Sequence, residues 1–575
     1  MELNWQTRGA LAPPTEVIDS IPEGMPHLIW QLLKTRGFVD HTVIQNWLTP
    51  SLKDLRDPMS LVDMPKAVDR LVQAFENNEK ICIYADYDLD GTSACALLKQ
   101  ALIWMGYQNV FHYQPSRLKE GYGLHNEAIK RLKDEHDITL MVTVDLGITA
   151  VEEVDYAKTL GIDVIVSDHH LPKETLPRAV AVVNPNSGLC VAGLGHLCGT
   201  GVAFYIVLAL KRALVAQGLL KTDFDPKQLL DCFAIGTLTD MVPLIEENRV
   251  LVKHGMIQLA QTKRPGLKAL LRALDLWGKP LTSQDVAIRF APKLNALSRL
   301  EMGIRPLDLY LVETDKEAES LVERVLLNNQ SRVEFQKAAE AEAFAYAKEN
   351  PPTSCIFVYS NNFHRGVVGL VATKLCQEYK LPAFVGSVGP NGQIVGSVRM
   401  PDASGLSALE AMEFAQDHLI QFGGHAAAAG FELKEETAEA FRAKLTEHFD
   451  KKKLEPSSRC WYYDCEAELG DLNPVFMNWY EHLSPFGTQN QPPVFCLRNL
   501  RLSQVKELKG GHYRLTFADS AQITRNGIWF SPPKGHPAAK NLKAGMQVSV
   551  LVEPQWNYFN GSKTLQFLVQ DLSLI

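Results

Sequence analysis

The chain has 575 residues, of which 46% are hydrophobic and 22% charged, so it can bury several cores, and its length suggests about three to five domains. The net charge of −8 excludes a uniformly basic nucleic-acid coat, but residues 451–575 hold 14 Lys+Arg against 10 Asp+Glu, a surplus of +4, which leaves −12 for residues 1–450. The ten cysteines form no CxxC pair, and neither a secretory signal nor a bilayer-length apolar run is visible, so we expect a reduced, cytoplasmic protein that does not cross a membrane.

An N-terminal helical segment is expected over residues 1–70, followed by an α/β domain over residues 71–312. In this second region the β-rich runs KICIYAD, TLMVTVD and DVIVSDHH alternate with helical patterns such as TSACALLKQALIWMG. Such alternation is typical of right-handed βαβ units. The pattern therefore predicts a parallel sheet.

Each of the three β-rich runs ends in a carboxylate: Asp86, Asp145 and Asp168. The carboxyl ends of parallel strands meet at one edge of a sheet, so these acids are expected to converge there. The sequence DYDLDG adds Asp88 and Asp90 to the first cluster, and SDHH adds His169 and His170 to the third. A calcium loop of the EF-hand type is excluded, because position 97 is Leu where the loop requires Glu.

Several carboxylates packed together cannot all stay ionised, because like charges raise one another's pKa. One or two divalent cations would resolve this conflict, and ligation by Asp and His without thiolates favours Mn²⁺ or Mg²⁺. Any single acid of the set is explained equally well as a helix cap, and the His pair as a solvated turn. The set as a whole favours a metal centre.

The second half of the chain predicts three further parts. Residues 313–350 contain no Gly or Pro and have apolar residues at helical spacing, which indicates a long connecting helix. Residues 351–450, with the runs SCIFVYS, PAFVGSV and QIVGSVRM, predict a second α/β domain. Residues 459–575 consist of short β-rich runs separated by turn residues, typical of a small β-barrel or sandwich.

Aromatic residues in the last part are candidates for stacking on bases: Trp529, Trp556 and Phe559, the last in an expected hairpin turn at residues 558–561. An aromatic residue in a small barrel is more often part of its core. The basic surplus of this region suits a phosphate backbone, although a solvated surface explains it nearly as well.

Four motifs in chain order, YADYDLDG, TVDLGI, SDHH and GTLTDMVPL, resemble those of the DHH phosphoesterases, a family named after the motif formed here by Asp168, His169 and His170. The segments SRLKEGYGL, AVVNPN, GTGVAFY, APKLNALSRL, FHRGVVGLVATKL, GSVRM and FGGHAAAAG extend the resemblance, over nearly the whole chain, to the single-strand-specific 5′→3′ DNA exonucleases of that family. The resemblance implies a DHH catalytic domain, a DHHA1 domain and a C-terminal OB-fold. Leu146 and Ser298 depart from the family pattern, but neither replaces a ligand.

The resemblance also implies roles for individual residues. The metal ligands would be Asp86, Asp88, Asp145, His169 and Asp240, with Asp145 bridging if two ions bind. The assignment of Asp240 rests on the resemblance alone. Asp90 and Asp168 would orient the ligands, and His170 would contact the scissile phosphate.

A pocket for a 5′-phosphate is implied at Arg117, Ser397 and Arg399, since two guanidinium groups and a hydroxyl suit a phosphate dianion. Taken singly, either arginine is better explained by a surface salt bridge. The resemblance places His425, Arg299 and Asn295 near the substrate as well.

The expected activity is metal-dependent hydrolysis of single-stranded DNA from its 5′ end, releasing mononucleotides, in recombination and repair. A narrow cleft between the two α/β domains would exclude a duplex. The expected partners are a single-stranded-DNA-binding protein and a helicase, and the chain is expected to be a monomer. Two alternatives remain: an enzyme of the same superfamily acting on small nucleotides, against which the β-rich tail counts, and a non-catalytic scaffold, against which the filled ligand positions count.

Overall fold

The computed structural model describes residues 4–8, 23–38, 40–220, 222–300, 302–402, 404–452, 460–533, 536–539, 541–559 and 562–575. The chain folds into two compact units. The first contains residues 1–55, 243–250 and 458–575, and the second contains residues 56–242 and 251–457. The expected N-terminal segment 1–70 is therefore divided between the two units.

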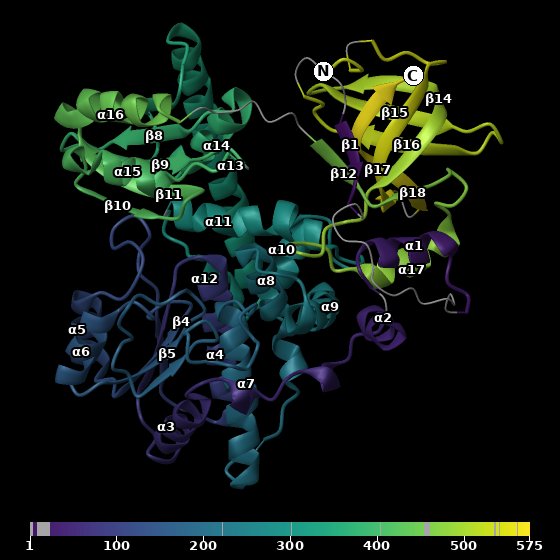
Figure 1. Ribbon diagram of the computed structural model, residues 1–575. Coiled ribbons are helices and arrows are strands. Elements are labelled where there is room, and N and C mark those ends of the chain that lie inside the picture. Colours follow the sequence, from purple (N-terminus) through teal and green to yellow (C-terminus); the bar gives the residue numbers. More distant parts are fainter. Residues whose placement is uncertain are drawn as a thin grey trace. The chain divides into compact units, whose positions relative to one another are not determined.

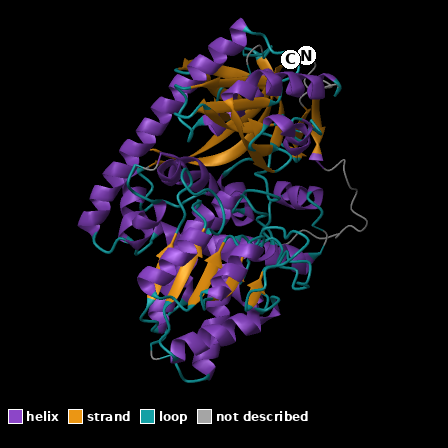
Figure 2. Cartoon of the chain, turned by 90° about the vertical axis from the view of Figure 1, so that its left-hand side faces the viewer, coloured by secondary structure: helices purple, strands orange, loops and turns teal. Residues whose placement is uncertain are grey.

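The second unit begins with the predicted parallel sheet, whose strand order is β3-β2-β4-β5-β6. Its strands are β2 (Ile81–Ala85), β3 (Val110–Tyr113), β4 (Leu140–Val144), β5 (Asp163–Ser167) and β6 (Ala181–Val183). Helices α5 (Asn126–His136) and α6 (Val151–Thr159) cover one face, and α4 (Leu89–Met105) and α7 (Gly199–Ala216) cover the other (Figure 1). Figure 2 shows helices packed around these strands. Burial on both faces explains why the strands are apolar runs.

Helix α7 is the one helix among the described residues that is long and apolar enough to span a membrane by length and composition. However, 67% of it is buried inside the unit. It packs against α3 (Met64–Glu76), α4 and α8 (Leu230–Asp240). This is the environment of a core helix, so its apolar composition is weak evidence for a membrane span.

The predicted connecting helix is present as α13 (Asp315–Glu349), which has 35 residues. Thr314 caps it, because its side chain accepts a hydrogen bond from the backbone N–H of Glu317. Its neighbours include α10, α11 and α14. The helices before it are α9 (Glu246–Ala260), α10 (Pro265–Ala273), a π-helical segment (Asp285–Phe290), α11 (Ala291–Leu300) and α12 (Pro306–Leu311).

The second α/β domain contains a five-stranded sheet of order β10-β11-β9-β8-β7. The strands are β7 (Ile356–Ser360), β8 (Ala383–Val388), β9 (Gln393–Arg399), β10 (Gln421–Gly424) and β11 (Ala428–Lys434), and the helices are α14 (Val368–Tyr379), α15 (Ala408–Phe414) and α16 (Ala438–Asp450). Only β7 and β8 pair in parallel, and the remaining pairs are antiparallel. The sheet is mixed because β8–β9 and β10–β11 are joined by short turns rather than by helices.

The first unit contains the predicted barrel. Strands β14 (Phe495–Leu508), β15 (His512–Ala518), β16 (Thr524–Trp529), β18 (Ser562–Leu574) and β17 (Gln547–Phe559) follow one another, and pairing of β17 with β14 closes the circle. Helices α1 (His27–Thr35), α2 (His41–Leu48) and α17 (Pro474–Leu483) share its core, and β13 (Cys465–Glu466) extends the sheet at β14. Strand β1 (Asn4–Thr7) pairs in parallel with β12 (Cys460–Tyr463). The N-terminal residues are thus part of the C-terminal domain.

Candidate metal centre and phosphate site

Strand register brings the predicted acids into one row. Ala85 lies opposite Val144, and Val144 lies opposite Ser167. The residues that directly follow these three strand ends are Asp86, Asp145 and Asp168. The ladder continues through them, because the Asp86 N–H donates to the Val144 carbonyl and the Asp145 N–H to the Ser167 carbonyl. The convergence expected from the sequence is therefore produced by backbone pairing.

Asp86 and Asp145 are buried, with 4% and 2% of their surface exposed, and each has an oxygen Oδ1 without a hydrogen-bond partner among the described residues. Burial and the Asp88 carboxylate raise the pKa of Asp86 to about 8, and burial with the neighbouring carboxylates raises the pKa of Asp145 well above its usual range. Asp145 adopts φ +64°, a left-handed conformation that Asp tolerates better than most residues. A buried carboxylate pair of this kind favours a bound cation.

Asp88 is the N-cap of α4. Its Oδ1 accepts hydrogen bonds from the N–H groups of Asp90 (2.8 Å) and Gly91 (3.0 Å). A Cβ atom at Gly91 would lie 2.6 Å from the carbonyl oxygen of Asp86, so only glycine permits the close approach of α4 to the end of β2. The cap thus fixes one oxygen of Asp88, and the glycine fixes the position of the helix beside Asp86.

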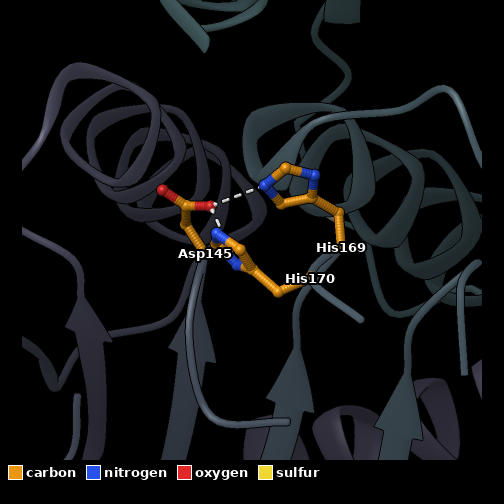
Figure 3. Close-up of side chains that lie close together, drawn as sticks. All are labelled: Asp145, His169 and His170. Carbon is orange, nitrogen blue, oxygen red and sulfur yellow. Dashed lines mark ion pairs between the residues drawn. The ribbon is translucent and has the colours of Figure 1, made fainter. Parts of the chain in front are cut away.

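The two histidines differ in their surroundings. His169 Nε2 lies 3.1 Å from Asp145 Oδ1 and 3.6 Å from Asp240 Oδ2, whereas His170 Nδ1 lies 4.0 Å from Asp145 Oδ1 (Figure 3). Burial lowers the pKa of His169, which keeps it neutral with a free lone pair. Burial acts in the same direction on His170, but its hydrogen bond with Asp168 and the nearby carboxylates raise its pKa to about 9. In this arrangement His169 is suited to bind a metal, and His170 to face a phosphate as a cation.

Both oxygens of Asp168 are engaged in hydrogen bonds. Its Oδ1 accepts from the His169 and His170 N–H groups and from His170 Nδ1, and its Oδ2 accepts from the Ile148 N–H. Burial would raise the pKa of Asp168, but the hydrogen bonds and charge of His170 lower it. The geometry agrees with an orienting role for this residue.

Asp90 is likewise committed to hydrogen bonds. Its carboxylate accepts from the Gly199 N–H (2.6 Å), the Thr200 N–H (2.9 Å) and the Thr200 hydroxyl (2.6 Å). It therefore caps the first turn of α7. One of its oxygens still lies 3.9 Å from His169 Nε2, so it borders the centre.

Asp240 is the last residue of α8 and lies at the same centre, and its Oδ2 has no hydrogen-bond partner within the described part of the chain. Burial and the Asp90 and Asp88 carboxylates raise its pKa to about 8. Metal-sized groups of ligand atoms are formed by Asp86, Asp88 and Asp145, by Asp145, His169 and His170, and by Asp90, His169 and Asp240. The unpartnered atoms of Asp86, Asp145, His169 and Asp240 fit a divalent cation bound through oxygen and one imidazole nitrogen.

The predicted phosphate residues Arg117 and Arg399 lie in one cationic cluster with Arg299. Burial, Arg117, Arg332 and Arg399 together lower the pKa of Arg299 to about 10, and burial with Arg117 lowers that of Arg399. Arg399 Nη1 donates to Ser397 Oγ at 3.2 Å. Among the described residues, no carboxylate forms an ion pair with Arg117, Arg299 or Arg399. A cluster of cations without counter-charge is suited to an anionic ligand.

The other predicted substrate residues are less clearly assembled. Asn295 is half-buried on α11, and His425 is exposed in the turn between β10 and β11. Among the described residues, no hydrogen bond or ion pair joins Asn295 or His425 to the arginine cluster.

The aromatic residues considered for stacking on bases differ in their surroundings. Trp529 is 1% exposed in the barrel core, so the stacking role considered for it is wrong: its ring is needed to fill the barrel. Trp556 is half-buried, with the Lys563 ammonium 4.3 Å from its ring centre. The backbone of Phe559 pairs with Ser562, but its side chain lies outside the described residues, as do residues 560 and 561 of the expected turn.

Several site residues carried no role in the sequence reasoning. The Asn184 amide donates to the His170 carbonyl, and the Asn186 amide donates to the His169 carbonyl, so they hold the turn that carries both histidines. A Cβ at Gly199 would lie 2.5 Å from Cβ of Asp145. The Tyr122 hydroxyl lies 3.4 Å from His170 Nδ1. All four residues lie in the family-like segments GYGL, AVVNPN and GTGVAFY, and this position could have identified them from the sequence.

Comparison with known proteins gives three family models. They describe the DHH family N-terminal domain (residues 80–237), the DHHA1 domain (residues 353–451) and the RecJ OB domain (residues 463–571). Two similar curated proteins, both called single-stranded-DNA-specific exonuclease RecJ, come from Bacillus subtilis (32% identity, covering 100% of this chain and 71% of the relative) and Dickeya dadantii (34%, 96% and 97%).

Solved structures agree with this. The crystal structure of RecJ from Thermus thermophilus in complex with Mn²⁺ matches with a TM-score of 0.78 at 27% identity, covering 96% of this chain and 76% of that one. The Mg²⁺ complex of the same protein matches with a TM-score of 0.72 at 25% identity, covering 95% and 74%.

Proposed function

Because this chain belongs to the RecJ family of DHH phosphoesterases, we propose that it hydrolyses single-stranded DNA from the 5′ end, one nucleotide at a time, with Mn²⁺ or Mg²⁺ as cofactor. The observation that carries the proposal is the combination, in one compact unit, of four ligand atoms and an arginine cluster for which the described residues provide neither hydrogen-bond partners nor counter-charge, respectively. The first suits a metal and the second suits a phosphate.

In this proposal Asp86, Asp88, Asp145, His169 and Asp240 hold one or two ions. When bound there, such ions would lower the pKa of a coordinated water and would offset negative charge on the phosphate. Asp168 keeps His170 protonated and oriented, so that its imidazolium stabilises the same developing charge. Asp90 holds the start of α7 against the centre.

Polarity would come from the arginine cluster. Arg117, Arg399 and the Ser397 hydroxyl would bind the terminal 5′-phosphate, and Arg299 would bind the strand nearby. Two contacts join the domains that carry these residues: Arg365 donates to the Leu118 carbonyl at 3.0 Å, and Arg299 donates to the Gly366 carbonyl at 3.3 Å. A fixed spacing between the domains would favour a single strand over a duplex.

A role in recombination and repair, a cytoplasmic location, a monomeric state, and cooperation with a single-stranded-DNA-binding protein and a helicase belong to the same proposal. They rest on the family alone. Size-exclusion chromatography with light scattering tests the monomer, and co-purification from cells tests the partners.

The activity is tested with 3′-labelled single strands that carry a 5′-phosphate or a 5′-hydroxyl, with Mn²⁺, Mg²⁺ or chelator, beside a blunt duplex and a dinucleotide. We expect metal-dependent shortening of the phosphorylated single strand. Arg399→Gln should reduce kcat/KM on it about 10- to 100-fold, as expected for lost charge-assisted hydrogen bonds. Arg178→Gln, which alters an exposed ion pair, is the matched control. Equal degradation of duplex, or faster turnover of the dinucleotide, would contradict the proposal.

A further inference from the structure

Tyr87 stands between two proposed metal ligands, Asp86 and Asp88, and its half-buried ring supports an arginine. The guanidinium carbon of Arg117 lies 5.2 Å from the ring centre of Tyr87. Arg117 comes from the loop that follows β3, so this contact joins two separate segments of the domain. One segment carries metal ligands, and the other carries the arginine proposed to read the strand end.

A second contact joins the same two segments at the backbone. Gln114 is buried at the base of the Arg117 loop, and its Nε2 donates to the Asp86 carbonyl (2.7 Å) and to Thr92 Oγ1 (3.0 Å). The adjacent Tyr87 carbonyl accepts a hydrogen bond of 3.1 Å from the Ser298 hydroxyl on α11. The backbone carbonyls of Asp86 and Tyr87 are therefore both fixed by hydrogen bonds.

The acid closest to Arg117 in sequence does not neutralise it. Glu120 accepts hydrogen bonds from the Tyr113 hydroxyl and from the Ser116 N–H, so both of its oxygens are used to shape the loop. Among the described residues, the side chain that contacts the Arg117 guanidinium is the ring of Tyr87. Stacking leaves the edge N–H groups of a guanidinium free, and these are the groups that bind a phosphate.

We propose that Tyr87 is a positioning residue that holds Arg117 at a fixed distance from the metal ligands, so that recognition of the terminal phosphate is coupled to cleavage of the next phosphodiester. This inference rests on the proposed function. In this role the face of the Tyr87 ring supports Arg117, and the Tyr87 hydroxyl is not required. Losing the ring should therefore reduce the preference for a 5′-phosphate more than it reduces cleavage itself.

The experiment measures the ratio of kcat/KM on a 5′-phosphorylated strand to that on a 5′-hydroxyl strand. Tyr87→Phe should keep the ratio. Tyr87→Leu should lower it about 3- to 10-fold, the range expected for loss of a partly desolvated cation–π contact. Mn²⁺ binding, followed by calorimetry, should be similar in the two variants.

A second variant keeps the test decisive if Tyr87→Leu folds poorly. Arg117→Lys keeps the charge but loses both the planar face and the forked donors, so it should lower the ratio at least as much as Tyr87→Leu does, and adding Tyr87→Leu to it should lower the ratio little further. A ratio that stays within about twofold of the wild type in Tyr87→Leu or Arg117→Lys overturns the inference. So does an equal loss of rate on both strands, which indicates a merely structural role.

Failure of the proposed function and failure of the role of Tyr87 give different results. If the wild-type protein shows no preference for a 5′-phosphate, the proposed reading of the strand end is wrong and the inference falls with it. If the wild type shows the preference, Arg117→Lys loses it and Tyr87→Leu keeps it, the inference alone is wrong.

Discussion

His169 Nε2 lies 3.1 Å from Asp145 Oδ1, and neither atom has a hydrogen-bond partner among the described residues. Burial lowers the pKa of His169, which favours the neutral imidazole, the form that ligates a metal. A divalent cation coordinated by both atoms would satisfy them at once. The pair is therefore the most direct indication of a metal in the whole centre.

The first prediction concerns Asp145→Asn. Loss of this ligand should lower the single-turnover rate with Mn²⁺ about 10³-fold or more, since metal catalysis supplies several kcal/mol. Without metal, the variant should melt at a higher temperature than the wild type, because a repelling charge is gone. Melting curves with Mn²⁺ and with chelator check this. Asp134→Asn, in an exposed ion pair with Lys130, is the control, and a rate loss under tenfold would argue against the ligand role.

The second prediction concerns Gly199→Ala. The added Cβ would lie 2.5 Å from Cβ of Asp145 and 2.7 Å from its Oδ1, so the carboxylate must move. We expect weaker Mn²⁺ binding and slower cleavage, with secondary structure retained. The comparison is Gly201→Ala, two residues along α7, where the contact is 3.1 Å to the flexible side chain of Leu197. Equal effects of the two substitutions would show that Asp145 is not displaced.

The sequence predicted those parts of the site that follow from strand ends. Asp86, Asp145 and Asp168 converge because register in a parallel sheet aligns whatever residue follows each strand. Asp240 arrives from the end of a helix, where no periodicity shows its direction, so only resemblance found it. The resemblance implies that Asp90 and Asp168 orient the ligands, and the hydrogen bonds that their oxygens accept are consistent with that role.

The sequence also did not show which residues approach each other closely, because these residues are far apart in the chain. The fit of Gly199 against Asp145 joins residues 54 positions apart, and the fit of Gln114 against Asp86 joins residues 28 positions apart. In the second α/β domain, apolar runs predicted the strands but not the antiparallel pairing, because direction depends on the length of each connection.

The third prediction concerns pH. Burial raises the pKa of Glu553, in β17, from 4.5 to about 7. Between these values the folded protein holds a proton that the unfolded chain releases, so the free energy of unfolding falls as pH rises, by at most about 3 kcal/mol. Glu553→Gln removes this dependence. Urea unfolding should show the variant and wild type similar at pH 4.5 and the variant more stable at pH 8; parallel pH profiles would contradict the assignment.

The fourth prediction separates two tryptophans of the barrel. Trp529→Ala should destabilise the barrel by about 3–5 kcal/mol, because it empties the core. Trp556→Ala should have a smaller effect on stability and should weaken binding of single-stranded DNA by about 1–3 kcal/mol, the value of one stacked base. Fluorescence titration with a labelled strand measures binding. Unchanged affinity in Trp556→Ala would remove this residue from the interface.

The hydrogen bonds of Asp90 have a consequence for how variants behave. This carboxylate joins the edge of the metal centre to the first turn of α7, a helix that is largely buried in its unit. We therefore expect the centre to be intact only in molecules whose core is folded. Damage to the core should lower the number of competent molecules in a preparation while each remaining molecule turns over at the normal rate, so specific activity becomes a measure of the folded fraction.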